Sequence, residues 1–586
     1  MQSILVKRPL PPVICVFCLL IASLKGTAAD ADLILHHGKI VTVDPQFSVQ
    51  QAIAVTGNRV VAVGDNELVL KQKGPSTKLV DLEGKMVLPG LIDSHVHPDA
   101  AMTEFDHPMP TMESIQDVLD YVKARAAVVP EGEWIPLRQV FITRLREQRY
   151  PTRAELDAAA PRHPVSFATG PDQVLNTPAL KLSGIDRNFK VTDGGPGHVE
   201  VDPQTGEPNG LLRGLGRFVK IKQSGKQPSE EDHYRRTLDL FKDYNSVGLT
   251  TVSDRNASPV SIERYQKMLD RGDLPVRMAI SHGVATLGPI EEIQQRIRAV
   301  AEHPLRRGGP MLRIIGIKTF LDGGMLTGSA YMREPWGVSK IYGITDPNYR
   351  GVLNIPRERL LPIVKTATEA GLQFTAHSVG DGAVHTLLDV YEEIDRTTPV
   401  RKTRACITHC NFMSREAVEQ AARLGVVIDI QPAWLYLDTR TLVNQFGYDR
   451  LRYFQPLKSI FAQGGIVGGG SDHMQKIDSL RATNPYNPFL GMWIAITRQA
   501  RWYEGKLHPE EGLTREQAIQ FYTRNNAYLL FLEDQVGSLE SGKLADMIVL
   551  DRDLLRCRED EIKDAQVLQT YVNGKLIFEK RSRRAR

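Results

Sequence analysis

Cysteine is scarce in this sequence, which has 5 cysteines among 586 residues. Cys15 and Cys18 lie near the N-terminus, outside any clear lipoprotein cleavage motif, and the others are Cys406, Cys410 and Cys557. Three cysteines in the remaining chain are too few for a disulfide framework, so the class of small proteins held together by disulfides is excluded. The stability of the fold must therefore come from a buried apolar core.

Strong charge of one sign is also absent. The formal net charge is +4, and much of the positive excess lies at the chain ends, within 7–25 and 580–586. A short basic tail is ordinarily solvated, so this distribution does not predict a nucleic-acid partner. The sequence has no internal repeat and no low-complexity segment. Its length and composition predict a globular protein with a large domain and smaller additions.

Long apolar runs are missing except near the N-terminus. There, Lys7 and Arg8 precede an apolar stretch at 13–24, and small residues follow in Gly26–Ala29. This order is typical of a secretory signal peptide, and we expect cleavage after Ala29. A retained anchor is the alternative, but about 12 apolar residues are too few for a bilayer that needs about 20. We therefore expect an exported protein, periplasmic or secreted, with no membrane contact after cleavage of residues 1–29.

Short strands with alternating apolar residues are expected at both ends of the mature chain. Five lie between residues 31 and 80, and others lie at 545–550, 567–572 and 576–578. Asn573 and Gly574 join the last two strands, and this dipeptide strongly favours a tight hairpin. The sequence therefore predicts one composite β-sandwich domain, built from residues 30–87 and 535–580.

Apolar runs alternate with amphipathic helical stretches between these two ends. That alternation predicts parallel strands with helical crossovers, and eight such strands make a (β/α)8 TIM barrel over residues 88–534. The expected strands are Met86–His95, Leu249–Asp254, Val276–Ser281, Ile314–Phe320, Gln373–His377, Arg404–His409, Val426–Gln431 and Ile466–Asp472. Helices are expected at Glu291–Ala301, Arg357–Ala370, Val384–Arg396 and Arg415–Leu424. The predicted fold class is therefore α/β.

A large insertion separates the first two expected strands. About 150 residues lie between them, whereas such connections usually have about 2 to 6 residues. We expect the insertion, at about 99–245, to form a subdomain or lid over the mouth of the barrel.

Six side chains with metal-binding or proton-transfer chemistry end the expected barrel strands. They are His95, His97, Lys318, His377, His409 and Asp472. The carboxyl ends of barrel strands meet on one face, and active sites lie there. His95 and His97 also point to the same side of an extended segment, so both can reach one metal ion. Two such histidines alone are weak evidence, and the shared position of all six residues predicts the metal site.

Lys318 ends an apolar run in which a free ammonium group is costly. Two explanations are open. The ammonium group could form an ion pair with Asp322. Alternatively, burial lowers the pKa of the amine, which takes up carbon dioxide and forms a carbamate whose oxygens bridge two cations.

Asp472 follows a Gly-Gly-Gly-Ser run and ends the last expected strand. A carboxylate beside a metal site can accept a proton from water and pass it to a leaving nitrogen. An aspartate that caps a turn or a helix is the alternative. The neighbouring His473 is expected to point elsewhere, and Cys406 and Cys410 are expected to be packing residues.

These residues belong to longer segments that resemble the amidohydrolase superfamily, in particular its YtcJ-like branch, which includes N-substituted formamide deformylases. The resemblance covers almost the whole mature chain. The similar segments are Val87–His97, Pro151–Ala160, Lys318–Gly323, His409, Ile430–Pro432, Gly470–Asp472 and Gly537–Asp546.

The resemblance implies hydrolysis of a carbon–nitrogen bond in an amide-like small molecule, with hydroxide supplied at a metal centre. It implies the ligand set His95, His97, Lys318, His377, His409 and Asp472, with Asp472 also catalytic. Zinc is the expected metal, as two Zn2+ ions bridged by carboxylated Lys318. The expected partner is the small-molecule substrate, and a homo-oligomer is left open.

Two segments depart from the pattern of this branch. An Asp-Gly-His run before an asparagine is replaced by Gly170–Asn176, and a Gly-x-Leu-x-Glu pattern is replaced by Gly210–Gly214. Both departures affect substrate-side groups, so hydantoins, N-acyl amino acids, dipeptides and lactones are open beside formamides. Trp434 and Tyr436 favour an apolar or aromatic substituent, unless they only pack the barrel. A metal-binding regulatory or solute-sensing barrel is the alternative function, although it would not need the carboxylate of Asp472.

Overall fold

The computed structural model describes residues 30–101, 107, 109–169, 172–222 and 228–581. Its centre is an eight-stranded parallel sheet with the order β20-β19-β18-β17-β16-β15-β14-β8. The strands are β8 (Leu91–Val96), β14 (Leu249–Ala257), β15 (Arg277–Gly283), β16 (Leu312–Phe320), β17 (Gln373–Ser378), β18 (Cys406–His409), β19 (Val427–Ile430) and β20 (Val467–Gly469). The predicted signal peptide, residues 1–29, lies outside the described residues.

The two edge strands of this sheet meet just beyond their ends and close it into a barrel. The backbone N–H of Asp472 donates to the carbonyl of His95 at 2.8 Å, and that of His97 donates to the carbonyl of His473 at 3.0 Å. Val96 and His473 also form an isolated parallel bridge. The predicted TIM barrel is confirmed, and each predicted strand overlaps a strand of the barrel.

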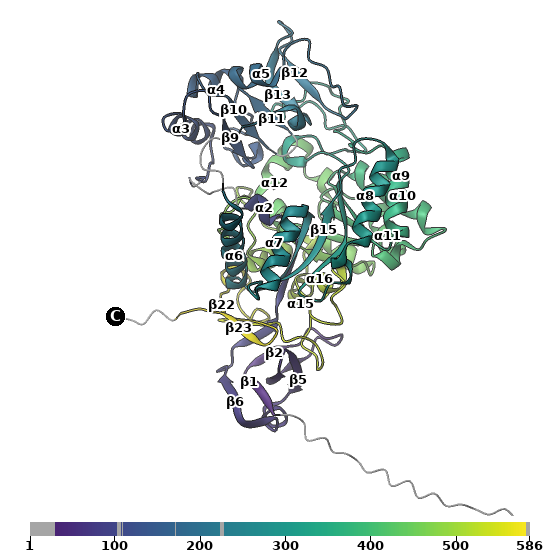
Figure 1. Cartoon of the computed structure of the whole chain (residues 1–586). Coiled ribbons are helices and arrows are strands. Elements are labelled where there is room, and N and C mark those ends of the chain that lie inside the picture. The colour runs from purple at the N-terminus through teal and green to yellow at the C-terminus, as the bar shows by residue number, and fades with distance from the viewer. Residues whose placement is uncertain (1–29, 102–106, 108, 170–171, 223–227, 582–586) are drawn as a thin grey trace, which may run out of the picture.

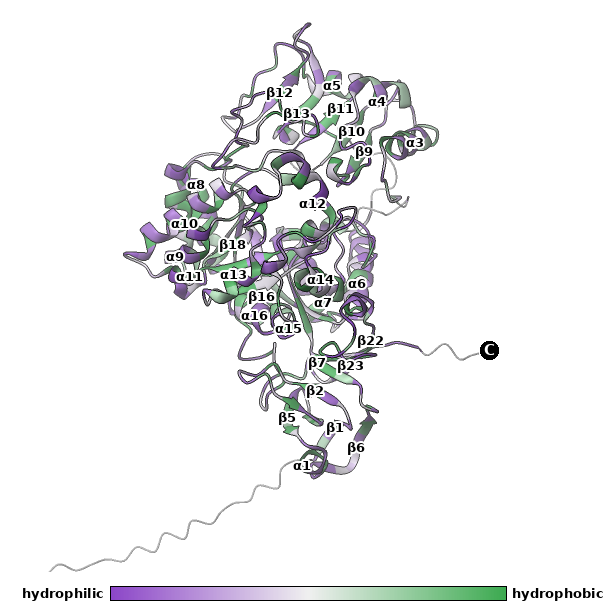
Figure 2. Ribbon diagram, turned by 180° about the vertical axis from the view of Figure 1, so that it is seen from behind, coloured by the Kyte–Doolittle hydropathy of each residue, from purple (hydrophilic) through white to green (hydrophobic). Residues whose placement is uncertain are grey.

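Helices cover the outside of the barrel (Figure 1). The longer ones are α6 (Glu230–Ser246), α7 (Pro259–Asp270), α8 (Ile290–Glu302), α9 (Arg357–Glu369), α10 (Asp381–Asp395), α11 (Arg415–Leu424), α12 (Pro432–Phe446) and α14 (Pro488–Thr497). Figure 2 shows hydrophilic and hydrophobic residues along the same helices, as expected for helices with one buried face. In α11, for example, Ser414 caps the N-terminus, and Ala417, Ala421 and Leu424 are buried one turn apart. In the described part of the chain, no helix is both long and apolar enough to cross a membrane.

Both chain ends contribute to a six-stranded sheet with the order β23-β22-β21-β7-β2-β3. Its strands are β2 (Lys39–Val41), β3 (Val49–Gln50), β7 (Met86–Pro89), β21 (Met547–Leu550), β22 (Val567–Val572) and β23 (Lys575–Glu579). A four-stranded sheet lies beside it, formed by β1 (Ala31–His36), β4 (Ala52–Thr56), β5 (Arg59–Gly64) and β6 (Lys73–Asp81). Ile40, Val55 and Met547 share one apolar cluster, so the two sheets pack together. The composite β domain predicted from both chain ends is therefore present, and these two sheets are called the two-ended β region below.

The prediction of one strand over Met86–His95 is wrong. The segment forms two strands in different sheets, because β7 pairs with β21 and β8 pairs with β14. Gly90 lies between them, and a Cβ atom at Gly90 would collide with the side chain of Thr250. The chain therefore passes from one sheet to the other at a residue that can contact the barrel closely.

The insertion has its own five-stranded sheet, with the order β12-β13-β11-β10-β9. It contains α3 (Ile115–Ala126), β9 (Ile135–Arg138), α4 (Arg153–Ala159), β10 (Val165–Ala168), β11 (Gln173–Leu175), α5 (Thr177–Ser183), β12 (His198–Val201) and β13 (Pro208–Arg213). These elements lie near α12, at the end of the barrel opposite the two-ended β region (Figure 1). The last helix of the predicted insertion, α6, lies against the barrel, since Asn245 donates to the carbonyl of Leu249.

A buried ion pair joins the barrel to the two-ended sheet. Arg277, at the start of β15, donates to both carboxylate oxygens of Asp546 at 2.6 and 2.7 Å and to Asn573 Oδ1 at 2.5 Å. Arg277 and Asp546 are almost completely buried. Asp546 also accepts from the backbone N–H of Asn573, so the pair is supported by further hydrogen bonds. Asp546, the last residue of the segment Gly537–Asp546, thus holds the two-ended sheet against the barrel.

We expect Asp546→Ala to lower the free energy of unfolding by about 3 to 5 kcal/mol, because it leaves the guanidinium group of Arg277 buried and unpaired. Equilibrium urea unfolding measures this loss. The double variant Arg277→Met/Asp546→Leu is the control, since it removes both charges and should lose less. A loss for Asp546→Ala no larger than that of the double variant would contradict the importance of the pair.

Candidate metal centre

Three of the predicted residues form a compact group at the carboxyl ends of β8 and β20. His95 Nε2 lies 3.1 Å from His97 Nε2, and Asp472 Oδ1 lies 3.4 and 3.2 Å from these two nitrogens. Ligand atoms around a tetrahedral zinc ion, with bonds of about 2.0 Å, are separated by about 3.3 Å. The two imidazoles and the carboxylate therefore fit one metal ion.

Local backbone structure directs these side chains toward one another. His95 and His97 are two residues apart at the end of β8, so their side chains emerge on the same side. Asp472 has φ 54°, in the left-handed region, and Asn484 donates to its carbonyl at 2.7 Å. The turn after β20 thus directs the carboxylate of Asp472 to the histidines of β8.

His377 and His409 lie beside this group. The ring centroid of His409 is 4.5 Å from that of His377 and 5.0 Å from that of His95. His409 Nδ1 lies 2.7 Å from Gln431 Oε1, an arrangement in which Nδ1 donates and Nε2 is free for a cation. His377 Nε2 lies 3.2 Å from the carbonyl of Gly323, which leaves Nδ1 free. The structure therefore brings all four predicted histidines together.

Lys318 lies in the barrel interior with its amine unsatisfied. The side chain is 1% exposed, and Nζ has no hydrogen-bond partner among the described residues. The suggested ion pair with Asp322 is wrong, because Asp322 accepts instead from the backbone N–H groups of Tyr331, Val379 and Gly380 at 2.9 to 3.0 Å. Burial lowers the pKa of Lys318 to about 8, although Asp429 and Asp472 oppose this shift. A buried amine of this kind is compatible with a carbamate.

The buried histidines are held in the neutral form that binds metal ions. Burial, reinforced by the positive charge of Lys318, lowers the pKa of His377 to about 3. Burial also holds the pKa values of His95 and His409 well below their usual range. All three imidazoles therefore have a lone pair for a cation at neutral pH.

Asp429 is a polar residue of the site that the sequence analysis missed. Its Oδ2 lies 2.9 Å from His95 Nδ1, and its Oδ1 accepts from Ser94 at 2.8 Å and from Gln431 at 2.7 Å. The carboxylate thus favours a proton on Nδ1 of His95, which leaves Nε2 for a metal ion. Burial raises the pKa of Asp429 to about 6, and Arg255 opposes this rise. A lone aspartate within the apolar segment Val427–Ile430 is the signal that could have revealed it.

Arg255 supplies positive charge beneath the centre. It lies on β14, is fully buried, and has its Nε 3.8 Å from Asp429 Oδ2. Its hydrogen bonds go to the carbonyl of Ser94 at 3.0 Å, to Ser281 at 2.9 Å and to Gln373 at 2.8 Å. These contacts reach four barrel strands, so Arg255 links the base of the site to the barrel wall.

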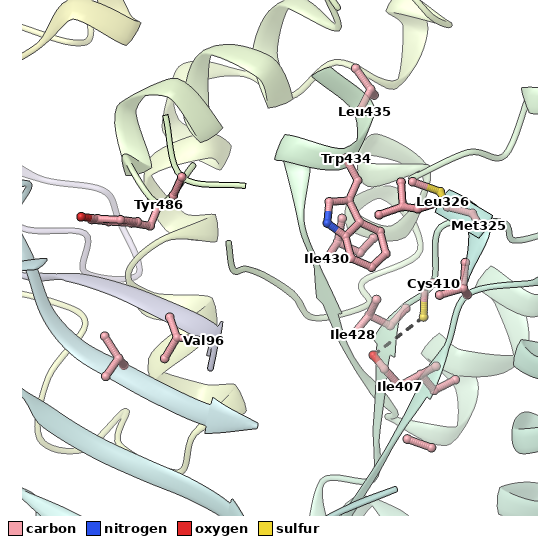
Figure 3. Packing of buried hydrophobic residues seen from close by; sticks show 14 of the residues in the cluster. Val96, Met325, Leu326, Ile407, Cys410, Ile428, Ile430, Trp434, Leu435 and Tyr486 are labelled. Carbon is pink, nitrogen blue, oxygen red and sulfur yellow. Dashed lines mark hydrogen bonds between the residues drawn. The ribbon is translucent and has the colours of Figure 1, made fainter. Parts of the chain in front are cut away.

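A cavity of about 610 Å³ opens beside the candidate metal ligands. Its walls include the candidate ligands His97, His377, His409 and Asp472. The described lining residues include apolar side chains and no lysine or arginine; the large apolar ones are Phe141, Phe320, Met325, Leu326, Trp434 and Met474. Figure 3 shows Trp434 close to Met325 and Leu326. Trp434 also stacks on His409 with a centroid distance of 4.6 Å.

Three neighbours that were expected to lie outside the centre do so. His473 has both ring nitrogens engaged elsewhere, with Tyr244 at 2.7 Å and the carbonyl of Lys476 at 2.9 Å. Cys406 and Cys410 are buried free cysteines. The thiol of Cys410 faces the carbonyl of Ile407 at 3.7 Å (Figure 3).

The two segments that depart from the expected pattern meet at a buried ion pair. Arg213 lies 3.1 Å from Asp172 and donates to the carbonyl of Thr327 at 2.7 Å. Asp172 accepts from the backbone N–H of Gly214 at 2.9 Å. Because Thr327 lines the cavity, this ion pair joins the insertion to the cavity wall. Gly170 and Pro171 lie outside the described residues.

Comparisons with known proteins agree with this architecture. The family described as the amidohydrolase family matches residues 78–578. The chain is similar to N-substituted formamide deformylase of Arthrobacter pascens, with 28% identity over 566 residues that cover 94% of this chain and 98% of that protein. It is similar to the putative amidohydrolase YtcJ of Bacillus subtilis, with 25% identity over 560 residues, or 93% and 99% of the two chains. A solved structure of an uncharacterized metal-dependent hydrolase from Pyrococcus horikoshii has a TM-score of 0.65 at 22% identity and covers 90% of this chain and 99% of its own.

We expect Asp429→Asn to weaken zinc binding by about 10- to 100-fold, because His95 loses the carboxylate that orients its ring. Competition with a chelator of known affinity measures the change. Asp438→Asn is a matched control, since Asp438 is buried but pairs with Arg144 at 3.1 Å. Equal zinc affinities for the two variants would show that Asp429 does not support the metal centre.

Proposed function

Because this chain belongs to the amidohydrolase family, we propose that it is a zinc-dependent hydrolase that cleaves the carbon–nitrogen bond of an amide-like small molecule. The similarity to a formamide deformylase over nearly the whole chain supports this bond class. The observation that carries the proposal is the convergence of His95, His97 and Asp472, of which His97 and Asp472 line the cavity. Hydrolysis would convert an amide and water into a carboxylic acid and an amine.

The donor set fits zinc. His95, His97 and Asp472 would hold one ion, and His377 and His409 would hold a second beside it. Neutral imidazoles and carboxylate oxygens are zinc ligands, and the buried amine of Lys318 has no hydrogen-bond partner among the described residues. A bound zinc ion would polarise the substrate carbonyl and lower the pKa of a water molecule.

We assign the proton transfer to Asp472. Its carboxylate lines the cavity and is held by Asn484, whose Nδ2 lies 3.3 Å from Oδ2. The group can accept a proton from the attacking water and donate it to the nitrogen as the carbon–nitrogen bond breaks. The leaving group then departs as a neutral amine rather than as an amide anion.

Carboxylation of Lys318 is part of the same proposal. The neutral amine adds to carbon dioxide, one proton is released, and the carbamate anion forms. Its two oxygens would then lie between the histidine pair of β8 and the pair formed by His377 and His409. A carbamate also replaces a buried, unpaired ammonium group with an anion suited to two cations, which removes an electrostatic cost.

The cavity favours an uncharged substrate with an apolar substituent. Phe141, Met325 and Trp434 offer apolar surface near the centre, and Asp99 and Asp254 lie on the walls. Asp99 is already paired with Arg264, so a free carboxylate on the substrate would find no lysine or arginine among the described lining residues to pair with. We therefore favour N-substituted formamides and related neutral amides over N-acyl amino acids and dipeptides.

Asp472→Asn tests the reaction. We expect turnover of an N-substituted formamide to fall by about 10²- to 10⁴-fold at full zinc occupancy, because the amide side chain cannot carry the proton. Steady-state kinetics with product amine quantification measures the loss, and bound zinc is counted in the same sample. Wild-type turnover in a fully loaded Asp472→Asn protein would exclude Asp472 as the proton carrier.

Lys318→Ala tests the carbamate. We expect loss of turnover and of the second zinc ion, and partial recovery of both when a short-chain carboxylate such as propionate occupies the space. His97→Ala is the control, because the same carboxylate does not replace an imidazole. Full activity of Lys318→Ala without added carboxylate would contradict a bridging role.

A further inference from the structure

A second cluster of metal-ligand type lies far from the barrel. His36 ends β1, His37 follows it, and Asp81 ends β6. In the described part of the chain, this is the other group of three whose ligand atoms lie within 4.8 Å of one another. Figure 1 shows β1 and β6 at the end of the molecule opposite the insertion, so the cluster is separate from the proposed active site.

The backbone brings the three side chains together. β1 and β6 are parallel neighbours, and His36 is the register partner of Asp81. His37 has φ 54°, a left-handed conformation that few residues with a side chain adopt. Its backbone N–H donates to Asn66 Oδ1 at 2.8 Å, which anchors the turn from β1 to β2. The donors are therefore fixed by strand pairing and by an anchored turn.

Three ligand-type atoms converge at His37. Its Nδ1 lies 3.1 Å from His36 Nδ1 and 3.1 Å from Asp81 Oδ2. A proton on this nitrogen would have to be shared between these two neighbours. The three atoms lie within 4.8 Å of one another, so a single cation can be bound by all of them at once.

The spacing and chemistry match zinc. Distances of 3.1 Å approach the separation of about 3.3 Å between ligand atoms around tetrahedral zinc. The second oxygen of Asp81 accepts from the backbone N–H of Glu83 at 2.9 Å, which orients the carboxylate. That hydrogen bond and the His37 contact also lower the pKa of Asp81, so it remains ionised. Two imidazoles and one carboxylate suit zinc better than calcium or magnesium.

We propose that His36, His37 and Asp81 form a second, peripheral zinc site that links the β1–β2 turn to the end of β6. The side chains of His37 and Asp81 are 53% and 52% exposed, so water can complete the coordination. This exposure indicates an exchangeable ion rather than one enclosed during folding. The site does not depend on catalysis in the barrel.

Calorimetric titration of the full chain with Zn2+, after the barrel centre has been loaded, tests this site. We expect wild type to bind one further equivalent that His36→Ala and Asp81→Asn do not bind. His198→Ala is a matched control, because His198 is an exposed histidine beside Glu200 outside the cluster, and it should keep the further equivalent. Equal stoichiometry in all four proteins would overturn the proposal.

A zinc-soaked crystal gives a second measurement that does not require variants. We expect an anomalous zinc peak about 2.0 to 2.2 Å from Nδ1 of both histidines and from Oδ2 of Asp81. A peak in the barrel without one at this cluster would also overturn the proposal. Because the readouts are stoichiometry and position, a failure here leaves the proposed hydrolase function untouched.

Discussion

The backbone hydrogen bonds that close the barrel also assemble the metal centre. Asp472 donates to the carbonyl of His95, and His97 donates to the carbonyl of His473, at the seam between the last and first strands. These bonds hold the carboxylate of Asp472 against the imidazoles of β8. Loss of the seam would expose the core and separate the candidate ligands at the same time. Barrel stability and site geometry therefore depend on the same pair of backbone hydrogen bonds.

Charge balance is the second requirement of this site. Lys318, Arg255 and Asp429 lie in the barrel interior, where an unpaired charge is costly. Asp429 meets part of this requirement by accepting hydrogen bonds from three directions, and burial keeps the nearby imidazoles neutral. Among the described residues, the amine of Lys318 has no hydrogen-bond partner. The interior would therefore be balanced in charge if two metal ions were bound by the imidazoles and if Lys318 carried a carbamate between them.

The barrel and its six candidate residues are predictable because their signals are local. The barrel strands contain short apolar runs, and each candidate residue lies at or near the end of a strand. The role of Asp429 is not predictable in this way, because its contact with His95 joins residues 334 positions apart. The hydrogen bonds of Asp322 are equally hard to predict from the sequence. Its carboxylate accepts from backbone N–H groups of Tyr331, Val379 and Gly380, and only the fold brings these groups close to it. The break between β7 and β8 at Gly90 also depends on a distant residue, because Gly90 packs against Thr250 of β14.

The two-ended sheet has a consequence for protein synthesis. β7 pairs with β21, so strands about 460 residues apart in the chain are neighbours. While the ribosome makes the barrel, β7 has an exposed edge on the side that β21 will cover. Such non-local pairing forms late and slows folding, and an open strand edge invites pairing with other chains. The β7 edge therefore stays unpaired on that side until β21 (Met547–Leu550) has been made, so this sheet can be completed only after the whole barrel sequence has been synthesised.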